Sequence, residues 1–245
     1  MTEKEFLSKY NPNEYEKPSV TADILVFTIN EQQQLELLLI KRGGHPYQGK
    51  WAIPGGFVGI DEAVDTAAKR ELAEETGLTD LYLEQLYTFG AVQRDPRMRV
   101  ISVAYMALVP QNKLNLRAGD DAAEAKVFQV MIDNWELGFT GGDGIYLTSA
   151  DLAFDHEEII RIGLNRLAGK LDYTNIGFEF LENPDCFTIY EFKQIYDAIK
   201  GKASDLGNFR RMFKKRYLDE GTVSELNETS TKYSKKEAKC YRYHC

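Results

Sequence analysis

The sequence predicts an α+β protein, an α/β/α sandwich followed by a winged helix-turn-helix unit. Two observations support this fold class. Up to about residue 150, segments rich in β-branched and aliphatic residues outnumber the helical ones. From residue 155 onward, apolar residues recur at helical spacing, and two short strand-like segments come last in the chain.

The first half contains a polar lead-in, several strands and one clear helix. Residues 1–18 form the lead-in, and Asp61–Thr76 has the pattern of a helix that Gly77 ends. Residues 134–149 are rich in glycine, so we expect a surface loop there. The expected strands are bounded by turn residues and span Ser19–Ile29, Leu35–Lys41, Trp51–Ile53, Tyr82–Gln93, Arg99–Val109 and Lys126–Val130.

The second half is mainly helical. Asp155–Gly169 has helical spacing, and Thr188 with Glu191 matches a capping box at the start of a helix that Gly201 ends. A basic helix over Asn208–Leu218 and two short strands follow, which is the element order of a winged helix-turn-helix. The expected organisation is a lead-in at 1–18, a sandwich domain at 19–151, a linker helix at 152–173 and a winged helix domain at 174–245.

The expected helix over Asp61–Thr76 carries an unusual group of carboxylates. Glu71, Glu74 and Glu75 share one face at about 3.6 residues per turn. Like charges so placed weaken a bare helix, whereas a bound divalent cation favours them. Carboxylate ligands suit Mg²⁺ or Mn²⁺ better than zinc. Gly55 and Gly56 allow the backbone to approach a metal ion or ligand closely.

Residues 56–78, GFVGIDEAVDTAAKRELAEETGL, resemble the Nudix box, Gly-x5-Glu-x7-Arg-Glu-U-x-Glu-Glu-x-Gly-U, where U is aliphatic. Every fixed position of the box is present. The resemblance implies a Nudix domain that hydrolyses a diphosphate linked to another group, with Mg²⁺ or Mn²⁺ as cofactor. It assigns metal binding to Glu71, Glu74, Glu75 and the carbonyl of Gly55, catalysis to Glu74 and Glu75, and structural roles in the motif to Gly56, Glu62, Arg70 and Gly77.

The general base stays open at this point. The resemblance allows either a glutamate of the box, as in some Nudix enzymes, or an acidic residue in a later loop, as in ADP-ribose pyrophosphatases. Asp120, Asp121, Glu124 and Glu136 are the later acidic residues that could accept a proton from water. We favour Glu124 because it immediately precedes an expected strand.

Substrate contacts are expected from arginines and aromatic residues. The segment from Arg94 to Arg97 resembles Nudix members related to ADP-ribose hydrolases, which implies cleavage of ADP-ribose to AMP and ribose 5-phosphate. Arginines can clamp phosphates with two hydrogen bonds, although solvated turn arginines are the alternative. The expected substrate residues are Arg42, Arg94, Arg97, Arg99 and Phe57, with Tyr47 and Trp51 as further aromatic candidates that could equally be packing residues.

The C-terminal segment is the more basic part of the chain. Leu206–Arg242 holds 10 basic and 5 acidic residues, although the whole chain has a net charge of −8. Short stretches near Asp155, Asn208 and Tyr241 resemble the C-terminal domain of Nudix-related transcriptional regulators, which implies binding of double-stranded DNA by a homodimer. The alternative is an accessory domain for dimerisation or substrate specificity. The expected DNA-binding residues are Arg210, Arg211, Lys214, Lys215, Lys235 and Lys236.

Two functions follow from these resemblances. The first is a Mg²⁺-dependent hydrolase of an ADP-ribose-like nucleotide, fused to a winged helix that can also regulate transcription. The second is a weakly catalytic or non-catalytic regulator that senses ADP-ribose or a sugar in NAD or carbohydrate metabolism. The intact box favours the enzyme, because regulators of this group often have damaged boxes.

Composition narrows the cellular setting. No apolar run approaches the ~18 residues of a membrane span, and the N-terminus has no apolar signal core. Three cysteines are too few for a disulfide framework, so we expect a cytoplasmic protein with no membrane partner. His156 is expected to cap or pack a helix, and Cys240, His244 and Cys245 have no suitable further ligand for a metal site.

Overall fold

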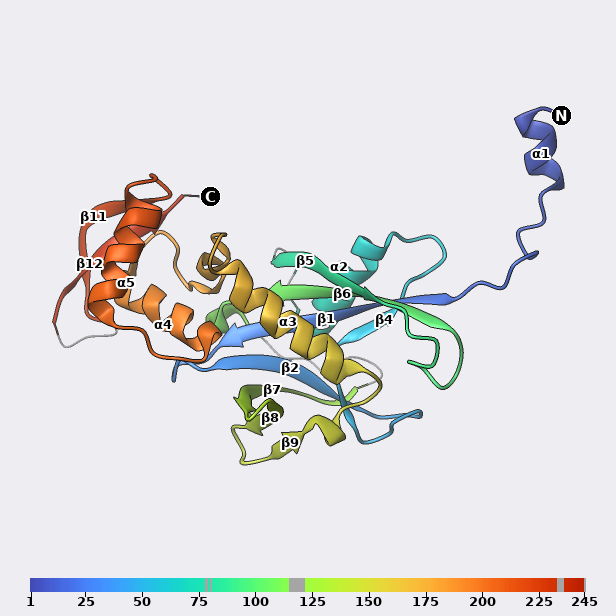
Figure 1. Ribbon diagram of the computed structural model, residues 1–245, viewed down its shortest axis with the longest axis horizontal. Helices are drawn as coiled ribbons and strands as arrows, with labels where there is room; N and C mark the ends of the chain where they lie inside the picture. The colour runs from blue at the N-terminus through green and yellow to red at the C-terminus, as the bar shows by residue number, and fades with distance from the viewer. Residues whose placement is uncertain (78, 80, 115–121, 233–235, 245) are drawn as a thin grey trace.

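The computed structural model describes residues 1–77, 79, 81–114, 122–232 and 236–244. Its larger part is a nine-stranded mixed sheet with the path β5-β6-β1-β2-β7-β8-β9, in which β3 pairs with β2 and β4 with β1 (Figure 1). β1 and β6 are parallel, and the other pairs are antiparallel. The strands are β1 (Ser19–Ile29), β2 (Leu35–Arg42), β3 (Trp51–Ala52), β4 (Gly55–Phe57), β5 (Tyr82–Phe89), β6 (Val100–Leu108), β7 (Ala122–Asp133), β8 (Glu136–Gly141) and β9 (Tyr146–Thr148).

Two helices cover the two faces of this sheet, which confirms the expected sandwich. Residues of β1 alternate between the faces, as a strand period of two requires. Ile24 belongs to the core cluster under α2 (Val64–Thr76), whereas Leu25 belongs to the cluster under α3 (His156–Lys170). Both side chains are fully buried. The apolar run in β1 therefore supplies two cores at once.

The C-terminal unit packs helices against a small three-stranded sheet. It contains α4 (Ile189–Lys200), α5 (Leu206–Phe213), a π-helical continuation of α5 over Lys214–Leu218, and the sheet β10-β12-β11. The strands are β10 (Phe187–Thr188), β11 (Val223–Ser230) and β12 (Ala238–Tyr243), and short 3₁₀ turns span Gln111–Lys113, Ser149–Asp151 and Ile176–Phe180. The element order is that of a winged helix, as expected. Its aromatic core is continuous with the core under α3.

Several segments differ from the sequence-based expectation. The strand expected up to Gln93 ends at Phe89. The lead-in contains an exposed helix, α1 (Glu3–Lys9), which projects away from the body (Figure 1). The box helix begins at Val64 rather than Asp61, because the carboxylate of Glu62 accepts from the backbone N–H of Gly59 at 2.8 Å and so serves a turn. It ends at Gly77 in the left-handed conformation (φ 72°), as expected.

The prediction of a surface loop over 134–149 is wrong. This segment forms β8 and β9, two further antiparallel strands of the large sheet. Leu137, Phe139 and Leu147 are buried, which gives the strands an inward face despite their glycines. Among the described residues, no helix is long and apolar enough to cross a membrane.

Candidate functional site

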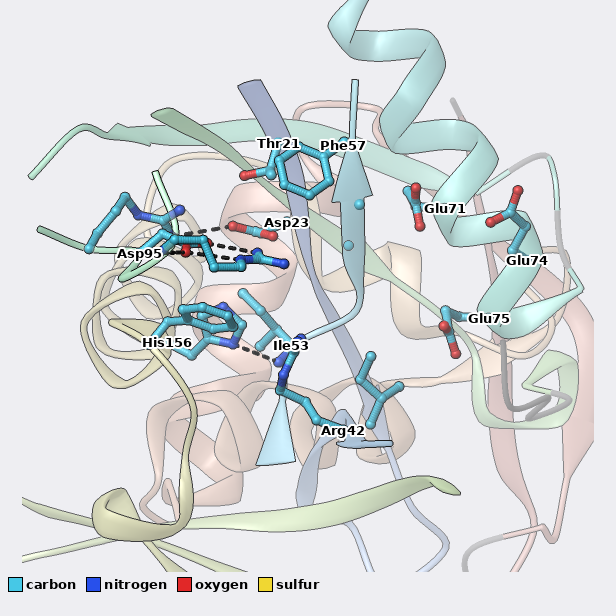
Figure 2. Close-up of a pocket in the computed structure, with 16 residues that line it drawn as sticks. Thr21, Asp23, Arg42, Ile53, Phe57, Glu71, Glu74, Glu75, Asp95 and His156 are labelled. Atoms are coloured by element: carbon cyan, nitrogen blue, oxygen red, sulfur yellow. Dashed lines mark hydrogen bonds and ion pairs between the residues drawn. The ribbon is translucent and has the colours of Figure 1, made fainter. Parts of the chain in front are cut away.

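A cavity of about 300 Å³ opens between the box helix, the strands β1 to β4, the segment before β6 and the start of α3. In Figure 2 the glutamates of α2 lie on one side of it, with Asp95 and His156 on the other. Its size suits a small-molecule ligand. It is lined by Thr21, Asp23, Ile40, Arg42, Ile53, Gly55, Gly56, Phe57, Glu71, Glu74, Glu75, Arg94, Asp95, Arg97, Phe154 and His156.

The box helix presents its three glutamates to this cavity. Glu71 is half-buried, Glu75 is buried, and the side chain of Glu74 is exposed. Burial raises the pKa of Glu71, an effect that the neighbouring guanidinium of Arg70 opposes. A β-carbon added at Gly56 would lie 2.0 Å from Oε1 of Glu71, so only glycine lets this carboxylate rest against β4.

Arg70 connects the segment before α2 to that helix. Its guanidinium contacts Glu62 at 2.9 Å and Glu71 at 2.6 Å, and it donates to the carbonyl of Phe57 at 3.3 Å. The hydrogen bond from Arg70 holds the pKa of Glu62 below its usual value. Glu62 and Arg70, to which the motif assigns structural roles, are therefore paired, and Arg70 also engages a glutamate of the expected metal site.

The donor chemistry of this wall suits a hard divalent cation. Three carboxylates face one cavity, and the backbone of Gly55 and Gly56 adds carbonyl oxygens, which are the ligands that Mg²⁺ and Mn²⁺ take. Within the part of the chain that the structure describes, no three acidic, His or Cys side chains already converge on a single point. Glu71 is instead directed to Arg70.

The opposite wall contains a buried ionic network that the sequence did not reveal. Arg94 donates to both oxygens of Asp155, at 2.8 Å from Nε and 2.7 Å from Nη2, and lies 3.5 Å from Asp23. Ser102 also donates to Asp23. Burial raises the pKa of Asp23, against the effects of the Ser102 hydrogen bond and the Arg94 charge. The sequence offered one signal for this network, because Asp23 is a carboxylate within the apolar run of β1.

The expected substrate arginines differ in their surroundings. Arg42 and Arg97 line the cavity; Arg42 donates to the carbonyl of Pro46, and Arg97 pairs with Asp95 at 2.8 Å. Arg94 also lines it, but its guanidinium is held by carboxylates. Arg99 lies outside the lining and donates to the carbonyls of Gly90 and Ala91.

Aromatic rings lie beside two of these arginines. The guanidinium of Arg97 is 5.5 Å from the ring of Phe57 and 5.9 Å from that of Phe154. Arg42 lies 5.0 Å from the ring of Phe154, which also contacts Tyr47. Phe154 was not singled out from the sequence, because its ring meets this group only through the fold. Trp51, by contrast, is buried against Phe128.

Of the candidates for the general base, the two that the structure describes, Glu124 and Glu136, are not among the residues that line the cavity. Glu124, in β7, pairs with Lys126 at 2.8 Å. Glu136 is exposed at the start of β8. Asp120 and Asp121 lie outside the described residues.

His156 is a buried packing residue. Its Nδ1 accepts a hydrogen bond from the backbone N–H of Ile53 at 3.0 Å, and the ring is 5% exposed. Burial lowers its pKa to about 3, so the imidazole is neutral. His244 lies 2.8 Å from the hydroxyl of Ser224, and Cys245 is outside the described residues.

The C-terminal unit presents a basic helix face. Phe209 and Phe213 bury one side of α5, and the opposite side exposes Arg210 and Arg211. Lys214 and Lys215 continue this exposed face. Lys236 is exposed on the hairpin between the last two strands. Lys235 lies outside the described residues. An exposed basic helix seated on an apolar core is the arrangement that helix-turn-helix proteins use to meet a DNA groove.

Comparison with known proteins gives this arrangement a family. Residues 19–133 match the NUDIX domain, and residues 177–243 match the NrtR DNA-binding winged helix domain. The chain is 32% identical over 247 residues to the "ADPR responsive transcriptional repressor NtrR" of Acinetobacter baylyi, covering 99% of this chain and 88% of that protein. The chain belongs to the NrtR-type Nudix proteins.

Two further proteins are similar to this NrtR-type protein, one along most of the chain and one along its Nudix part. A crystal structure of Shewanella oneidensis NrtR complexed with a 27mer DNA matches with a TM-score of 0.70 and 28% identity, covering 92% of this chain and 93% of that one. The ADP-ribose pyrophosphatase of Methanocaldococcus jannaschii is 36% identical over 158 residues, which is 64% of this chain and 79% of that protein. The chain thus combines a Nudix domain with a DNA-binding winged helix domain of the NrtR type.

Proposed function

We propose that this protein is a transcriptional regulator that binds ADP-ribose in its Nudix cavity and double-stranded DNA through its winged helix. The observation that carries the proposal is the match along nearly the whole chain to an ADPR-responsive repressor. The chemistry agrees, because the cavity has carboxylates, arginines and two phenylalanine rings within reach of one small ligand. Two copies acting on a two-fold symmetric operator would follow from the usual pairing of such domains.

The DNA-binding part can be tested by fluorescence anisotropy on the DNA upstream of the protein's own operon. Arg210 and Arg211 replaced together by alanine should weaken binding and reduce its salt dependence, because each phosphate contact releases counterions. Lys17→Ala is the control, since it removes an exposed charge from the lead-in. Equal loss in the control, or no binding by the wild-type chain at low salt, would refute this part of the proposal.

The ligand-binding part can be tested by calorimetry with ADP-ribose. We expect 1:1 binding to each chain, and we expect added ADP-ribose to change the affinity for DNA. Light scattering on the same samples measures whether the chain is a dimer. A monomer that binds DNA tightly would contradict the proposed pairing of two copies.

A second function, Mg²⁺-dependent hydrolysis of ADP-ribose to AMP and ribose 5-phosphate, is favoured by the intact box. Bound Mg²⁺ would neutralise the phosphates and lower the pKa of the attacking water. Glu71, Glu74 and Glu75 would hold the cation, and Arg70 with Glu62 would keep the helix and loop in register. Arg42 and Arg97 would bind the phosphates and ribose from the other side.

This activity can be measured by chromatography of AMP in the presence of Mg²⁺ or Mn²⁺. Glu75→Gln should abolish turnover, while Glu158→Gln, an exposed glutamate on α3, should leave it unchanged. Loss of kcat in Glu124→Gln or Glu136→Gln, with Mn²⁺ binding retained, would identify the general base. Equal turnover in Glu75→Gln and the wild type would rule out the Nudix site as its source.

A further inference from the structure

The start of α3 is part of the wall of the Nudix cavity. His156, the first residue of α3, accepts a hydrogen bond from the N–H of Ile53, and Ala153 donates to the carbonyl of Trp51 at 2.7 Å. β3 leads directly into Gly55 and the glycine of the box. The N-terminal end of α3 is therefore bonded to the backbone that lines the cavity, as the close-up in Figure 2 shows for His156 and Ile53.

A second attachment at the same end is ionic. Asp155, which immediately precedes α3, receives two hydrogen bonds from the guanidinium of Arg94, and Arg94 is 8% exposed. The same guanidinium lies beside Asp23. Two carboxylates thus share one buried cation that faces the cavity. Such a network adds little net stability over apolar packing, but its geometry is specific.

The C-terminal end of α3 is attached to the winged helix. Arg216, in the π-helical continuation of α5, donates to the carbonyls of Leu171 and Thr174, both at 2.6 Å. Lys200, the last residue of α4, donates to the carbonyl of Ala168 at 2.8 Å. Both helices of the helix-turn-helix pair are therefore bonded to the end of α3 that lies farthest from the cavity.

Between these attachments α3 is a continuous helix of 15 residues, about 22 Å long at 1.5 Å per residue. It lies closely against the sheet at Gly163, where an added β-carbon would come within 2.1 Å of Leu25. It lies along the large sheet and leads to the C-terminal unit (Figure 1). An element of this kind moves as one body, since packed interiors shift between discrete arrangements rather than deform continuously.

We propose that α3 couples the cavity to the winged helix, with Arg94 as the positioning residue that responds to an anionic ligand. This inference rests on the proposed function and adds the route of its regulation. A diphosphate entering the cavity competes with Asp155 for the guanidinium of Arg94. Weakening that pair removes one of the attachments at the N-terminal end of α3, and the change reaches α5 through the two carbonyls that Arg216 holds. Arg94 is thus a coupling group and not only a phosphate ligand.

The coupling is measured as the ratio of the DNA dissociation constants with and without saturating ADP-ribose in the full-length chain. Typical couplings between sites are about 5- to 150-fold. Asp155→Asn keeps the size of the side chain but removes the charge that competes with a phosphate. Arg216→Lys keeps the charge near DNA but cannot bridge both carbonyls. In each variant we expect the ratio to fall to about 1. In Asp155→Asn the DNA dissociation constant without ADP-ribose should already be close to that of the ADP-ribose-bound wild type, because the substitution itself weakens the pair with Arg94. Arg216→Lys lies far from the cavity and should change the affinity for ADP-ribose by no more than about twofold.

Glu158→Gln is the matched control on α3, because it removes an exposed carboxylate one turn from Asp155, and its ratio should equal that of the wild type. Hydrogen exchange supplies a second readout: ADP-ribose should alter amide exchange in residues 206–218 of the wild type but not in Asp155→Asn. A wild-type ratio retained in both variants would overturn the inference, as would a wild-type ratio of 1. Failure of the wild type to bind ADP-ribose or DNA at all would instead refute the proposed function.

Discussion

Replacing His156 by asparagine tests the buried hydrogen bond at the start of α3. The Oδ1 of asparagine can accept from the N–H of Ile53 as Nδ1 does, but asparagine does not titrate. The folded pKa of His156 is about 3, lowered first by burial, whereas an unfolded histidine has a pKa of about 6.5. Above pH 6.5 the imidazole is neutral in both states and contributes no pH dependence. Below pH 6.5 the unfolded chain binds a proton that the folded protein cannot bind. The free energy of unfolding therefore decreases as the pH is lowered from 6.5 to about 3.

The size of this effect follows from the two pKa values. Each pH unit between them lowers the free energy of unfolding by about 1.4 kcal/mol for one group. Between pH 7.5 and 5.5 the wild type should therefore lose about 1.4 kcal/mol more than His156→Asn, and by pH 4.5 about 2.7 kcal/mol more. The space left by the smaller side chain lowers the stability of the variant equally at every pH. This cost therefore cancels when the loss of stability between two pH values is compared for the two proteins.

The assay is urea unfolding followed by circular dichroism at pH 7.5, 5.5 and 4.5. Titration of the carboxylates is common to both proteins and cancels in the comparison. Equal losses in the wild type and the variant would show that His156 is accessible to protons in the folded protein. A histidine resonance of the wild type that is absent from the variant and titrates near pH 6.5 would refute the reasoning in the same way.

Three other substitutions test local packing. Gly56→Ala should displace the flexible carboxylate of Glu71 and weaken Mn²⁺ binding by calorimetry, with thermal stability little changed; unchanged binding would separate Glu71 from the metal site. Gly163→Ala should lower stability by about 1–3 kcal/mol through overpacking against Leu25, although alanine favours helices, and a rise in Tm would contradict the close packing. Thr188→Ala removes the side-chain cap of α4 and should cost about 1 kcal/mol in urea unfolding, a loss that Thr188→Ser should largely avoid.

Local patterns predicted most of the fold. The apolar run of β1, the capping threonine of α4 and the glycine that ends the box helix each act through neighbours within a few residues. Such signals are visible in the sequence because periodicity and capping are local properties. The prediction for the segment over β8 and β9 failed because it relied on the number of glycines, which is typical of a loop. The alternation of Leu137 and Phe139, with a glycine between them, indicates a strand instead.

The candidate site divides in a similar way. The three glutamates of the box that face the cavity lie within five residues on one helix, so their shared face follows from the helical repeat. The network around Arg94 does not, because Asp23 is 71 residues away and Asp155 is 61 residues away. An arginine beside a turn has the same appearance in the sequence whether it is solvated, binds phosphate or is buried between carboxylates. Only the fold distinguishes these states.

The position of α3 also changes how the two functional parts relate. A helix expected as a linker contributes Ile159, Ile160 and Leu164 to the core beneath the sheet, so it is one of the two helical layers of the sandwich. The same helix ends in bonds to the winged helix. A flexible linker would leave the two parts independent of each other, whereas this helix is packed against the sheet and bonded at its far end to the winged helix. For this reason we expect any coupling between the cavity and the winged helix to depend on the bonds at the two ends of α3, and not on the length of the connection between the domains.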